Sequence, residues 1–573
     1  MNTSQFRSSL RHLRQAPLFV GLALACAGVA AQAAERPSFE QRLDEHRIAT
    51  RHHLAMRAAQ APAAPVRPAG TLAVTNCADD GDGSLRAAFA AAASGDTIDL
   101  TALQCSTITL TSGALATSAN DLTLNGPGAD LLAIDGNNQD RIIDHTGTGT
   151  LTLNALSLSN GLYDGTNTVY GEGDGGCVLS TGSVTLDGVD MDHCTTIAGW
   201  VTGGAIRANA IVQLTDSTIT NTTATATRDG FSAGAYGGVV YGGVAYLDRT
   251  TISGATITVT GTNTAFCGSI GGGILTFGGV ILTDSTVTGV NMSVSAPKDA
   301  YAEGGGIAAR NAIILYNSTV SNNIVSGTPG AGPVGAYTYR SAIRGGGLYI
   351  GRTPEGTPIP ALISGSTLSG NAALVVGDPG DYTFNGGGAV LAHGQRTVAV
   401  VNSTISGNST ALNGGGLYAH DFGSFSLANS TVTDNTAQNG GGIVDAGTRL
   451  SYDVVTDSSI IAGNHTLGAA GNDIETLHSI TGANNLIASA NVPLPEGTLT
   501  GDPMLAPLAN NGGLTMTHAL LAGSPAIDTG SNERALETDQ RGDGFARVVG
   551  ATSDIGAFEV QGVNDTIFAN GFE

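Results

Sequence analysis

The stretch Gly386–Asn435 reads GGGAVLAHGQRTVAVVNSTISGNSTALNGGGLYAHDFGSFSLANSTVTDN and contains two copies of one pattern. Each copy begins with three glycines, continues as a short segment of alternating apolar residues, and ends in Ser-Thr, an aliphatic residue, two small or polar residues and Asn. Variants of this pattern recur over most of the chain. An internal repeat of this length predicts a solenoid, which grows by stacking equivalent units.

Ten units share a pair of aliphatic or methionine residues at positions i and i+5. In nine of them residue i−2 is also apolar, and only Asp453 breaks this rule. Because alternate residues of a strand share a face, residue i+5 can join the other two only if the chain bends before it. We therefore predict one corner per unit, at the Asp/Asn-Ser-Thr position. The pairs are Leu153/Leu158, Leu186/Met191, Leu214/Ile219, Leu247/Ile252, Leu282/Val287, Leu315/Val320, Ile363/Leu368, Val400/Ile405, Leu427/Val432 and Val455/Ile460.

The distance between successive units varies from 27 to 48 residues. We interpret the shortest spacings, 27 and 28 residues, as one circuit of a wide parallel β-coil, and we assign the excess in longer units to loops. The best loop candidates are residues 321–362 and 370–397. Stacking at roughly 4.8 Å per coil gives a rod of about 10–13 coils.

Glycines and asparagines mark the remaining corners. Gly triplets begin at residues 271, 304, 345, 386, 414 and 440, where we expect positive φ angles and close backbone approach. Asn323, Asn371, Asn408 and Asn435 each follow the second apolar anchor by three residues, and Cys194 takes that position in its unit. Asn tolerates the left-handed conformation, and stacked Asn side chains can hydrogen-bond along the coil axis.

The combination of GGGI or GGGL with STISGN or STVSNN is similar to the repeats of polymorphic outer membrane proteins. More broadly, it resembles the right-handed parallel β-helix, or pectin-lyase-like, superfamily over roughly residues 100–480. The resemblance implies an all-β fold, a right-handed parallel β-helix solenoid. It is specific for the fold and carries little information about function.

The rest of the chain divides into short segments around the solenoid. Arg7, Arg11 and Arg14 precede an apolar run, as in an export signal, and Ser84 can cap a short helix that ends before Gly95 and covers the first coil. The predicted divisions are 1–33, signal peptide; 34–70, helical arm and Pro/Ala linker; 71–100, N-terminal cap; 101–480, β-helix; 481–560, C-terminal region; 561–573, tail.

The C-terminal region contains GDPMLAPLANNGGLTMTHALLAGSPAIDTG and TDQRGDGFARVVGATSDIGAFE. These segments resemble the choice-of-anchor type of region on secreted bacterial β-helix proteins. The final DTIFANGFE resembles short terminal tags on exported proteins of some Gram-negative bacteria. The two resemblances imply a protein that is secreted or held on the outer surface of a Gram-negative cell.

The charge distribution limits the partners. Residues 1–70 hold nine arginines and four acidic residues, so the chain from 71 onward carries 15 basic and 43 acidic residues. Such an acidic body argues against nucleic acid and anionic membranes as partners. No later segment is long and apolar enough to span a membrane, and we expect a monomer.

Five cysteines remain after the predicted signal. Export makes disulfides plausible: Cys77–Cys105 could staple the N-terminal cap and Cys177–Cys194 could bridge within one coil. Cys267 would then be unpaired and buried.

Candidate chemistry is weak. Arg310, Arg352, His393 and His420 each follow the start of a Gly triplet by six or seven residues and could form a column on one face, with Asp421 and Asp434 close to His420 in sequence. Polar residues are also expected where a strand ends at an exposed corner. We therefore assign no catalytic, cofactor-binding or metal-binding residue. Calcium stays an open alternative at the acidic loops 79–82 and 539–543, although neither matches a full calcium-loop pattern.

The leading functional prediction is a secreted or cell-surface scaffold, adhesin-like and non-catalytic, whose partner is an extracellular glycan or a surface protein. The alternative is a polysaccharide lyase or a glycoside hydrolase acting on an extracellular glycan. Trp200 is the single tryptophan, which disfavours a carbohydrate cleft. A modest aromatic surface is nevertheless expected from five tyrosines. They are Tyr236, Tyr241, Tyr246, Tyr337 and Tyr339.

Overall fold

The computed structural model describes the chain from residue 69 to residue 562, apart from short internal gaps. The described ranges are 69–166, 172–229, 233–262, 267–297, 300–329, 342–351, 361–376, 385–394, 396–421, 423–447, 453–468 and 471–562. The predicted signal peptide, nearly all of the helical arm and of the terminal tail, Arg352, Tyr337 and Tyr339 lie outside these ranges. So do residues 330–341 and 352–360 of the first predicted loop and residues 377–384 and 395 of the second.

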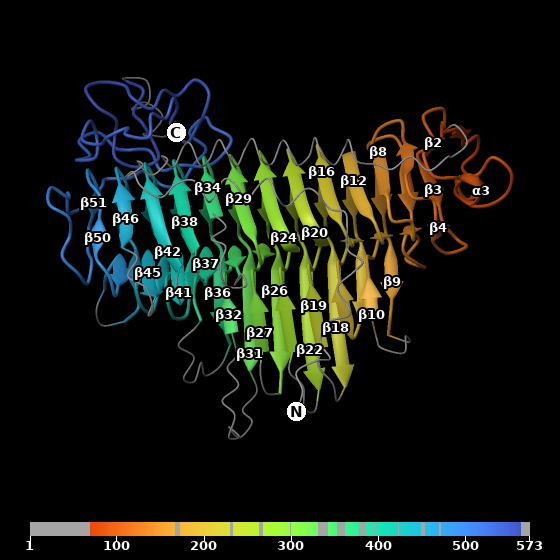
Figure 1. The fold of residues 1–573 in the computed structure, drawn as a ribbon, viewed down its shortest axis with the longest axis horizontal. Helices are drawn as coiled ribbons and strands as arrows, with labels where there is room; N and C mark the ends of the chain where they lie inside the picture. Colours follow the sequence, from red (N-terminus) through yellow and green to blue (C-terminus); the bar gives the residue numbers. More distant parts are fainter. Residues whose placement is uncertain are drawn as a thin grey trace, which may run out of the picture. The chain divides into compact units, whose positions relative to one another are not determined.

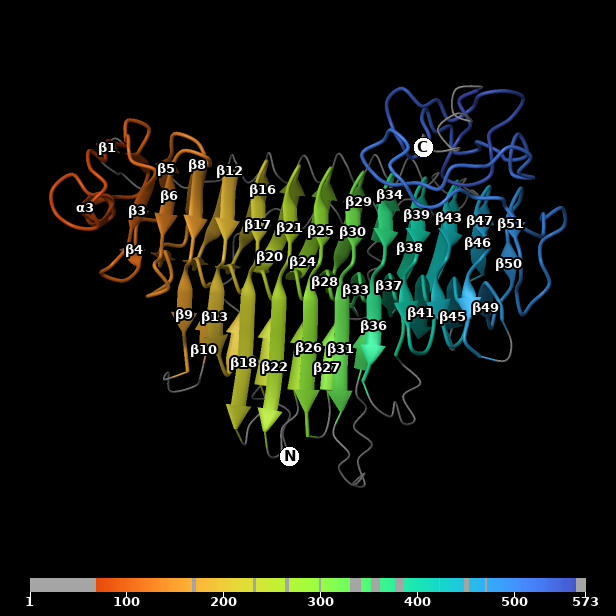
Figure 2. The ribbon, with the colours of Figure 1, turned by 180° about the vertical axis from the view of Figure 1, so that it is seen from behind.

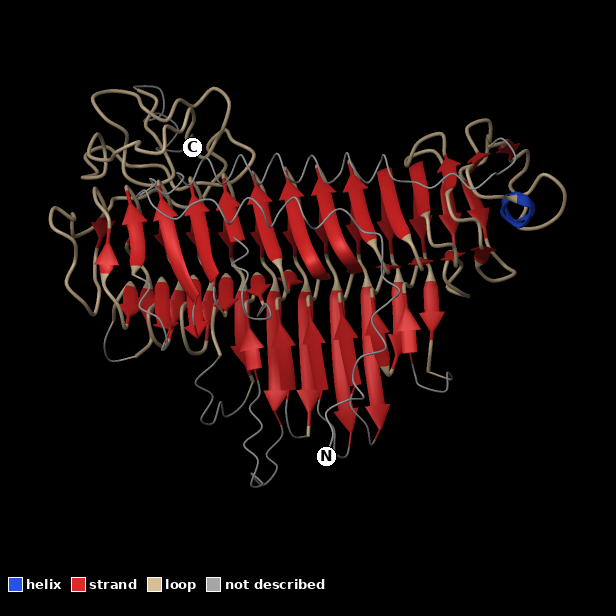
Figure 3. Cartoon of the chain, viewed as in Figure 1, coloured by secondary structure: helices blue, strands red, loops and turns tan. Residues whose placement is uncertain are grey.

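The described chain forms a right-handed parallel β-helix (Figures 1 and 3). All named strand pairs are parallel, and each strand pairs with its counterpart one coil before and one coil after. One coil illustrates the path, and its strands are β15 (Ile206–Ala208), β16 (Ile211–Thr215), β17 (Thr218–Thr220), β18 (Thr223–Asp229) and β19 (Ala233–Tyr236). The next coil begins at β20 (Val240–Asp248).

Strands that follow the glycine corner form one column. Its twelve members agree with the predicted number of coils. They are β4 (Leu115–Thr117), β7 (Ile143–His145), β11 (Val178–Ser180), β15, β20, β24 (Ile274–Thr283), β28 (Ile307–Ala309), β33 (Leu348–Ile350), β37 (Val390–His393), β41 (Leu417–Asp421), β45 (Ile443–Gly447) and β49 (Ile474–Thr476).

The strands on both sides of the predicted i/i+5 corner form two further columns in the same sheet. They are β5 (Leu122–Asn125), β8 (Thr150–Ser159), β12 (Ser183–Asp192), β16, β17, β21 (Thr251–Ser253), β25 (Thr286–Thr288), β29 (Ala312–Tyr316), β30 (Thr319–Ser321), β34 (Ala361–Ser364), β35 (Thr367–Ser369), β38 (Arg396–Val401), β39 (Thr404–Ser406), β42 (Gly423–Ala428), β43 (Thr431–Thr433), β46 (Val454–Asp457), β47 (Ile460–Ile461), β50 (Ile480–Thr481) and β51 (Leu486–Ile487).

Two smaller parallel sheets complete each coil. The ten-stranded sheet contains β9 (Leu162–Asp164), β13 (Thr195–Ala198), β18, β22 (Thr256–Thr262), β26 (Asn291–Ala296), β31 (Ile324–Pro329), β36 (Ala372–Val375), β40 (Ser409–Thr410), β44 (Thr436–Ala437) and β48 (His465–Thr466). The six-stranded sheet contains β10 (Glu172–Asp174), β14 (Trp200–Thr202), β19, β23 (Cys267–Ile270), β27 (Ala300–Glu303) and β32 (Ala342–Arg344).

The predicted i/i+5 corner is confirmed in nine of the ten units. Their anchors stack on one another in register and are almost fully buried. In each unit the residue at i+2 has a positive φ, for example Asp216 at 46° and Asn402 at 50°. This left-handed residue turns the strand and lets i+5 face the core.

The tenth pair, Val455/Ile460, is wrong by one residue. Leu427 pairs with Thr456, and Val432 pairs with Ile461, so these two residues take the inner positions. The strand register decides which residues face inward here, and hydrophobicity does not. The register is set because backbone hydrogen bonds align this coil with the preceding one. Ile460 instead packs against the C-terminal region.

The asparagine ladder is confirmed and is longer than predicted. The side-chain amide of Asn323 donates to Asn371 at 3.0 Å, and the chain of bonds continues through Asn408, Asn435 and Asn464 to Asp473. These residues are buried, apart from the half-buried Asn464, and none of them adopts the left-handed conformation. The preceding residue does so instead, as at Asn322 (54°) and Asp434 (58°). The two roles that we assigned to one Asn therefore belong to neighbouring residues.

The glycine corner uses two conformational properties in succession. Gly387 has a φ of 74°, and a Cβ on the following Gly388 would overlap the carbonyl oxygen of Gly415 in the next coil. The first glycine is therefore needed for the turn and the second for close stacking. The register aligns Gly387, and not Gly386, with Gly345 and Gly414, so this unit is offset by one from the predicted triplet.

The N-terminal end of the solenoid contains α3 (Leu85–Ala91), which is the only helix among the described residues. Four short strands accompany it: β1 (Thr71–Ala73), β2 (Asp96–Asp99), β3 (Thr107–Thr109) and β6 (Ala133–Asp135). Ser84 caps the start of this helix, as predicted, because its hydroxyl accepts a hydrogen bond from Ala87 N–H at 3.2 Å. The buried residues Leu85 and Phe89 close the end of the core. This helix is too short to cross a membrane, and none of the helices within the described ranges could do so.

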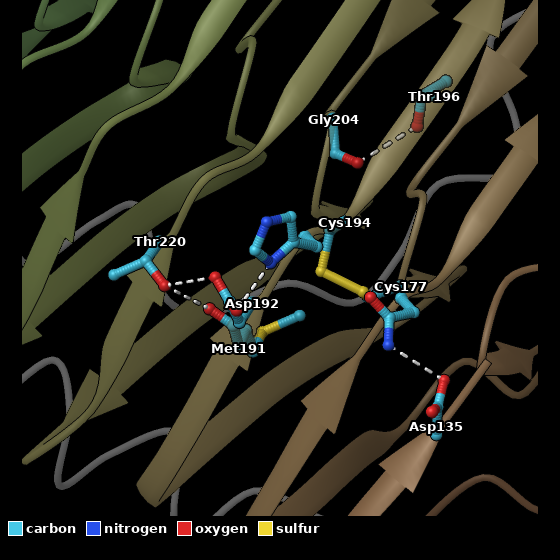
Figure 4. Close-up of a disulfide and its surroundings, with 10 residues drawn as sticks. Asp135, Cys177, Met191, Asp192, Cys194, Thr196, Gly204 and Thr220 are labelled. Carbon is cyan, nitrogen blue, oxygen red and sulfur yellow. Dashed lines mark hydrogen bonds and ion pairs between the residues drawn. A yellow bond between two sulfur atoms is a disulfide. The ribbon is translucent and has the colours of Figure 1, made fainter. Parts of the chain in front are cut away.

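Both predicted disulfides are confirmed. Cys77 pairs with Cys105 in the cap, and Cys177 pairs with Cys194 with a Cα–Cα distance of 5.3 Å (Figure 4). Cys194 occupies the column position that Asn fills in later coils, so the disulfide replaces the amide ladder there. Cys267 is free and buried, as predicted.

The C-terminal region from about residue 501 contains little regular structure and lies against β35, β39, β43 and β47 (Figures 1 and 2). Two buried arginines hold it together. Arg541 is sandwiched between the rings of Phe545 and Phe558, each 3.9 Å from its guanidinium carbon, and it pairs with Asp539. Arg547 pairs with Glu559 at 3.1 Å.

Candidate functional site

Outward-facing side chains from two strand columns converge at the glycine corner. One set lies directly before the first glycine of each unit, and the other lies four residues after it. We call this surface the glycine-corner face. The first set is Asp174, Thr202, Tyr236, Ile270, Glu303 and Arg344. The second set is Leu179, Arg207, Tyr241, Leu275, Ala308, Tyr349, Leu391, Tyr418 and Val444.

The two sets contact each other. Arg207 donates to Asp174 at 2.8 Å, which joins the first set to the second. Leu275, Tyr349 and Tyr418 belong to one apolar cluster that lies outside the solenoid core, with Tyr236 and Ile270 packed against it. The solenoid therefore has a second apolar layer on one outer face, where a soluble coil normally carries polar groups.

Aromatic rings concentrate at the early part of this face. The rings of Trp200 and Tyr236 are stacked, with centroids 5.6 Å apart and planes 4° from parallel. Gly234 makes this stack possible, because a Cβ there would lie 2.6 Å from the indole ring. Tyr241 makes an edge contact with Phe277, whose side chain is 42% exposed.

A cavity of about 230 Å³ lies further along this face, and Ile270 of its lining follows Tyr236 by one coil. It exists because Ala308 and Gly351 are small, whereas their neighbours in the adjacent coils, Leu275 on one side and Tyr349 and His393 on the other, are large. The complete lining is Ile270, Leu275, Glu303, Ala308, Ala309, Arg310, Tyr349, Gly351 and His393.

Glu303 is the buried acid of this cavity. Burial raises the pKa of its carboxyl group, and the neighbouring Arg344 and Tyr349 partly oppose that shift. Arg344 donates to Glu303 at 3.1 Å. Burial also raises the pKa of Tyr349, whose hydroxyl lies 3.4 Å from Nδ1 of His393. The result is a connected group of one acid, one phenol and one imidazole with a cation on each side.

The predicted column is confirmed in part. Arg310 and His393 line the same cavity, and His420 pairs with His393 in the next coil with ring centroids 5.6 Å apart. The suggestion that Asp434 belongs to this column is wrong. Asp434 has a left-handed φ of 58° at a corner of the coil, and it lies near His518 of the C-terminal region. The structure does not describe the side chain of Asp421.

Sequence reasoning missed Glu303, Arg344 and Tyr349. A signal was present, because these residues hold fixed positions relative to the first glycine, namely −1 and +4. Of the tyrosines expected to form a surface, Tyr236 and Tyr241 come together here. Tyr246 lies beyond the bend of β20, paired with Gln213 and Ile281.

In each of the two acidic loops considered for calcium, the first aspartate is engaged by protein donors. Asp79 accepts from Arg86 and Thr111, and its pKa is lowered to about 2, where burial opposes the shift and these hydrogen bonds produce it. Asp539 accepts from Arg541 and from the N–H of Glu559. Within the described residues no group of three or more acidic, His or Cys side chains is placed to hold a metal ion.

The fold defines the chain as a parallel β-helix protein. No protein-family model and no curated protein sequence matches it. Among solved structures it is similar to one described as the crystal structure of pectate lyase Pel9A, with 14% identity and a TM-score of 0.34. That match covers 86% of this chain and 97% of the other.

Proposed function

We propose that this protein is an extracellular or cell-surface β-helix protein that binds a glycan on the glycine-corner face without cleaving it. The observation that carries the proposal is the stacked Trp200–Tyr236 pair, which lies one coil before a cavity with the polar groups Glu303, Arg310 and His393 in its lining. Aromatic faces accept the apolar C–H faces of sugar rings, and a few convergent polar groups fix orientation. The cavity is small, about 230 Å³, and in this proposal it accepts a single sugar residue or substituent.

Carboxylate placement favours binding over hydrolysis. Glycosidases use two carboxyl groups about 5–9.5 Å apart. Glu303 is the one carboxyl group among the described residues that line the cavity, and Asp174 lies four coils away in the same column. At roughly 4.8 Å per coil that separation is about 19 Å. Both carboxylates are also paired with arginines.

The extracellular part of the proposal rests on three features. Two disulfides are typical of oxidising compartments. The predicted signal peptide and the resemblance of the C-terminal region to choice-of-anchor segments agree with export. Fractionation of cells into medium, envelope and cytoplasm tests this part, and a cytoplasmic location would contradict it.

The binding proposal is tested with the full chain on an immobilised panel of neutral and acidic glycans. We expect binding to at least one glycan, with no release of reducing ends or unsaturated products. Phe277→Ala should weaken binding at least tenfold, because Phe277 is the most exposed ring beside the cavity. Leu477→Ala is the matched control, since Leu477 is 67% exposed and lies far along the solenoid. Equal loss in both variants, or no binding at all, would contradict the proposal.

A lyase is the second candidate, favoured by one observation. Tyr349 and His393 are 3.4 Å apart and share the cavity with Arg310. β-Elimination from a uronate needs a base for the proton beside the carboxylate and a cation that neutralises the carboxylate. Release of an unsaturated product that is abolished by His393→Ala would establish this candidate in place of the first.

A further inference from the structure

The cavity on the glycine-corner face is small, and it lies where two outward columns lack a large side chain. Ala308 lies between Leu275 and Tyr349 in one column. Gly351 directly follows β33, and His393 ends β37 in the next coil. The volume of about 230 Å³ is below the range of about 300–1,000 Å³ for pockets that enclose drug-sized ligands. The cavity therefore fits a substituent of a sugar ring.

The walls of the cavity differ along the solenoid axis. Ile270 and Leu275 form an apolar wall in the coil that precedes Ala308. Tyr349 and His393 form a polar wall in the two coils that follow it. A group that fills the cavity therefore meets apolar side chains at one end and hydrogen-bonding side chains elsewhere.

The polar groups of the cavity supply both an acceptor and donors. The Glu303 carboxylate accepts from Arg344 at 3.1 Å and from the hydroxyl group of Tyr349. A carboxylate has about four lone-pair sites, so these two bonds leave it able to accept a further hydrogen bond. Arg310 lies at the exposed rim with its guanidinium carbon 4.8 Å from the ring centroid of Phe277. Its guanidinium group carries several N–H donors.

We propose that the cavity binds the acetamido group of a 2-acetamido sugar, so that the glycine-corner face selects glycans with N-acetylated sugars. This inference rests on the glycan-binding function proposed above. The methyl group packs against the apolar wall of Ile270 and Leu275. The amide N–H donates to Glu303, and the carbonyl oxygen accepts from Arg310. Each part of the substituent thus has a matching group in the lining.

Other substituents of sugar rings match the lining less well. A hydroxyl group has no methyl to cover the apolar wall, and an O-acetyl ester has no N–H for Glu303. A carboxylate places a second negative charge beside Glu303, whereas an ammonium group places a positive charge beside Arg310 and Arg344. A buried polar or charged group without a partner is costly, so these differences should appear as differences in affinity.

Saturation-transfer NMR of the full-length protein tests the inference with free N-acetylglucosamine, N-acetylgalactosamine, glucosamine, glucose and glucuronic acid. The acetyl methyl protons should receive the strongest saturation of any ligand protons. At least one of the two N-acetylated sugars should bind at least tenfold more tightly than glucose. Equal binding of glucose, a preference for glucuronic acid, or no transfer to an acetyl methyl group overturns the inference.

The glycan panel separates this inference from the proposed function. If the protein binds panel glycans that contain no N-acetylated sugar as tightly as those that contain one, the acetamido assignment is wrong and the glycan-binding function stands. If the protein binds no glycan and no free sugar, the proposed function itself fails, and the assignment fails with it.

Ala308→Leu fills the cavity and should weaken binding of the N-acetylated sugar at least tenfold. Leucine suits this column, because Leu275 and Leu391 occupy it in other coils. The matched control is Thr258→Leu, which adds the same side chain on the outward face of β22 in the ten-stranded sheet and should bind like the wild type. Unchanged binding in Ala308→Leu, or equal loss in the control, overturns the inference.

Glu303→Gln is a second variant that retains the size of the side chain. Arg344 holds the side-chain oxygen, so the amide of the glutamine presents N–H groups to the ligand N–H in place of an acceptor. Binding of the N-acetylated sugar should fall at least tenfold, and unchanged binding would show that Glu303 does not accept from the ligand. Thermal unfolding shows whether each variant is folded, and Glu303→Gln tests the inference should Ala308→Leu not fold.

Discussion

A single charged side chain in the interior of the solenoid has a large effect on its stability. Asp445 faces inward on β45, in register with Ala419 and Thr476, and is 1% exposed. One carboxylate oxygen accepts from Gly447 N–H at 3.1 Å, and the other has no hydrogen-bond partner. Burial raises its pKa to about 6. This acid therefore lies in the interior between the small side chains of Ala419 and Thr476.

Asp445→Asn should stabilise the protein above pH 6 and leave it nearly unchanged near pH 4. The folded pKa lies above the unfolded value, so the native state favours the protonated form, and stability falls as pH rises from about 4 through 6. A shift of about two units corresponds to roughly 3 kcal/mol. Thermal unfolding between pH 4 and 8 measures the difference, and a variant that is less stable than the wild type at pH 8 would refute it.

The elements of this fold are held in register by ladders that run along the axis. The asparagine ladder satisfies buried backbone groups as well as its own amides: Asn371 Oδ1 accepts from the N–H of Asn323, and its amide donates to the Val320 carbonyl. A serine ladder does the same at the other corner, where Ser318, Ser366 and Ser403 each accept a backbone N–H from the preceding coil. Each corner is thus tied to its neighbours twice.

Asn371→Ala should destabilise the solenoid by about 2–4 kcal/mol, because it leaves buried polar groups in two coils without partners. The matched control is Asn291→Ala, an exposed position on β26, which should change stability by less than about 0.5 kcal/mol. Chemical denaturation measures both. Similar losses in the two variants would show that the ladder contributes nothing specific.

The Cys177–Cys194 disulfide replaces this ladder in the early coils. Its removal by Cys177→Ser with Cys194→Ser should cost about 3 kcal/mol, since the bond closes a loop of 17 residues. The unfolding midpoint of the variant should no longer respond to a reductant at this position. A variant as stable as the wild type would mean that the coil is held by its strand pairing alone.

At the scale of the whole molecule, the C-terminal region is bonded to coils that lie far away in sequence. The bonds from Gln540 to Thr367 and Thr404 cross 173 and 136 residues. Ile460 and Leu486 of the last coils pack with Leu520, Ile555 and Phe558 of the C-terminal region in one apolar cluster. The region therefore covers the side of the last coils as well as the outward hydroxyl groups of Thr367 and Thr404.

Gln540→Ala should loosen the C-terminal region while leaving the solenoid folded, because it removes a side chain that bonds to two coils. Limited proteolysis should then cleave after about residue 500 faster than in the wild type, by at least tenfold. Gln438→Ala, at an exposed position, is the control and should leave the rate unchanged. If the solenoid were cleaved at the same rate as the C-terminal region, the prediction that the two are held separately would be contradicted.

The sequence by itself determined the right-handed parallel β-helix, the corners, the asparagine ladder, the capping helix and both disulfides. These features follow from local rules that repeat in every coil, namely side-chain alternation, left-handed corner residues and anchor spacing. The rules failed at Val455/Ile460, where hydrophobicity pointed one residue away from the register. Stacking on the preceding coil, which no single unit records, overrode it.

Only the tertiary structure decided what lies on the outside. Glu303, Tyr349 and His393 come from three different coils, and their meeting depends on the small Ala308 and Gly351 between larger neighbours. The docking of the C-terminal region depends on an irregular chain held by Arg541 and Arg547. Such contacts obey no period, because each one is set by the shapes of side chains that the repeat leaves free to vary.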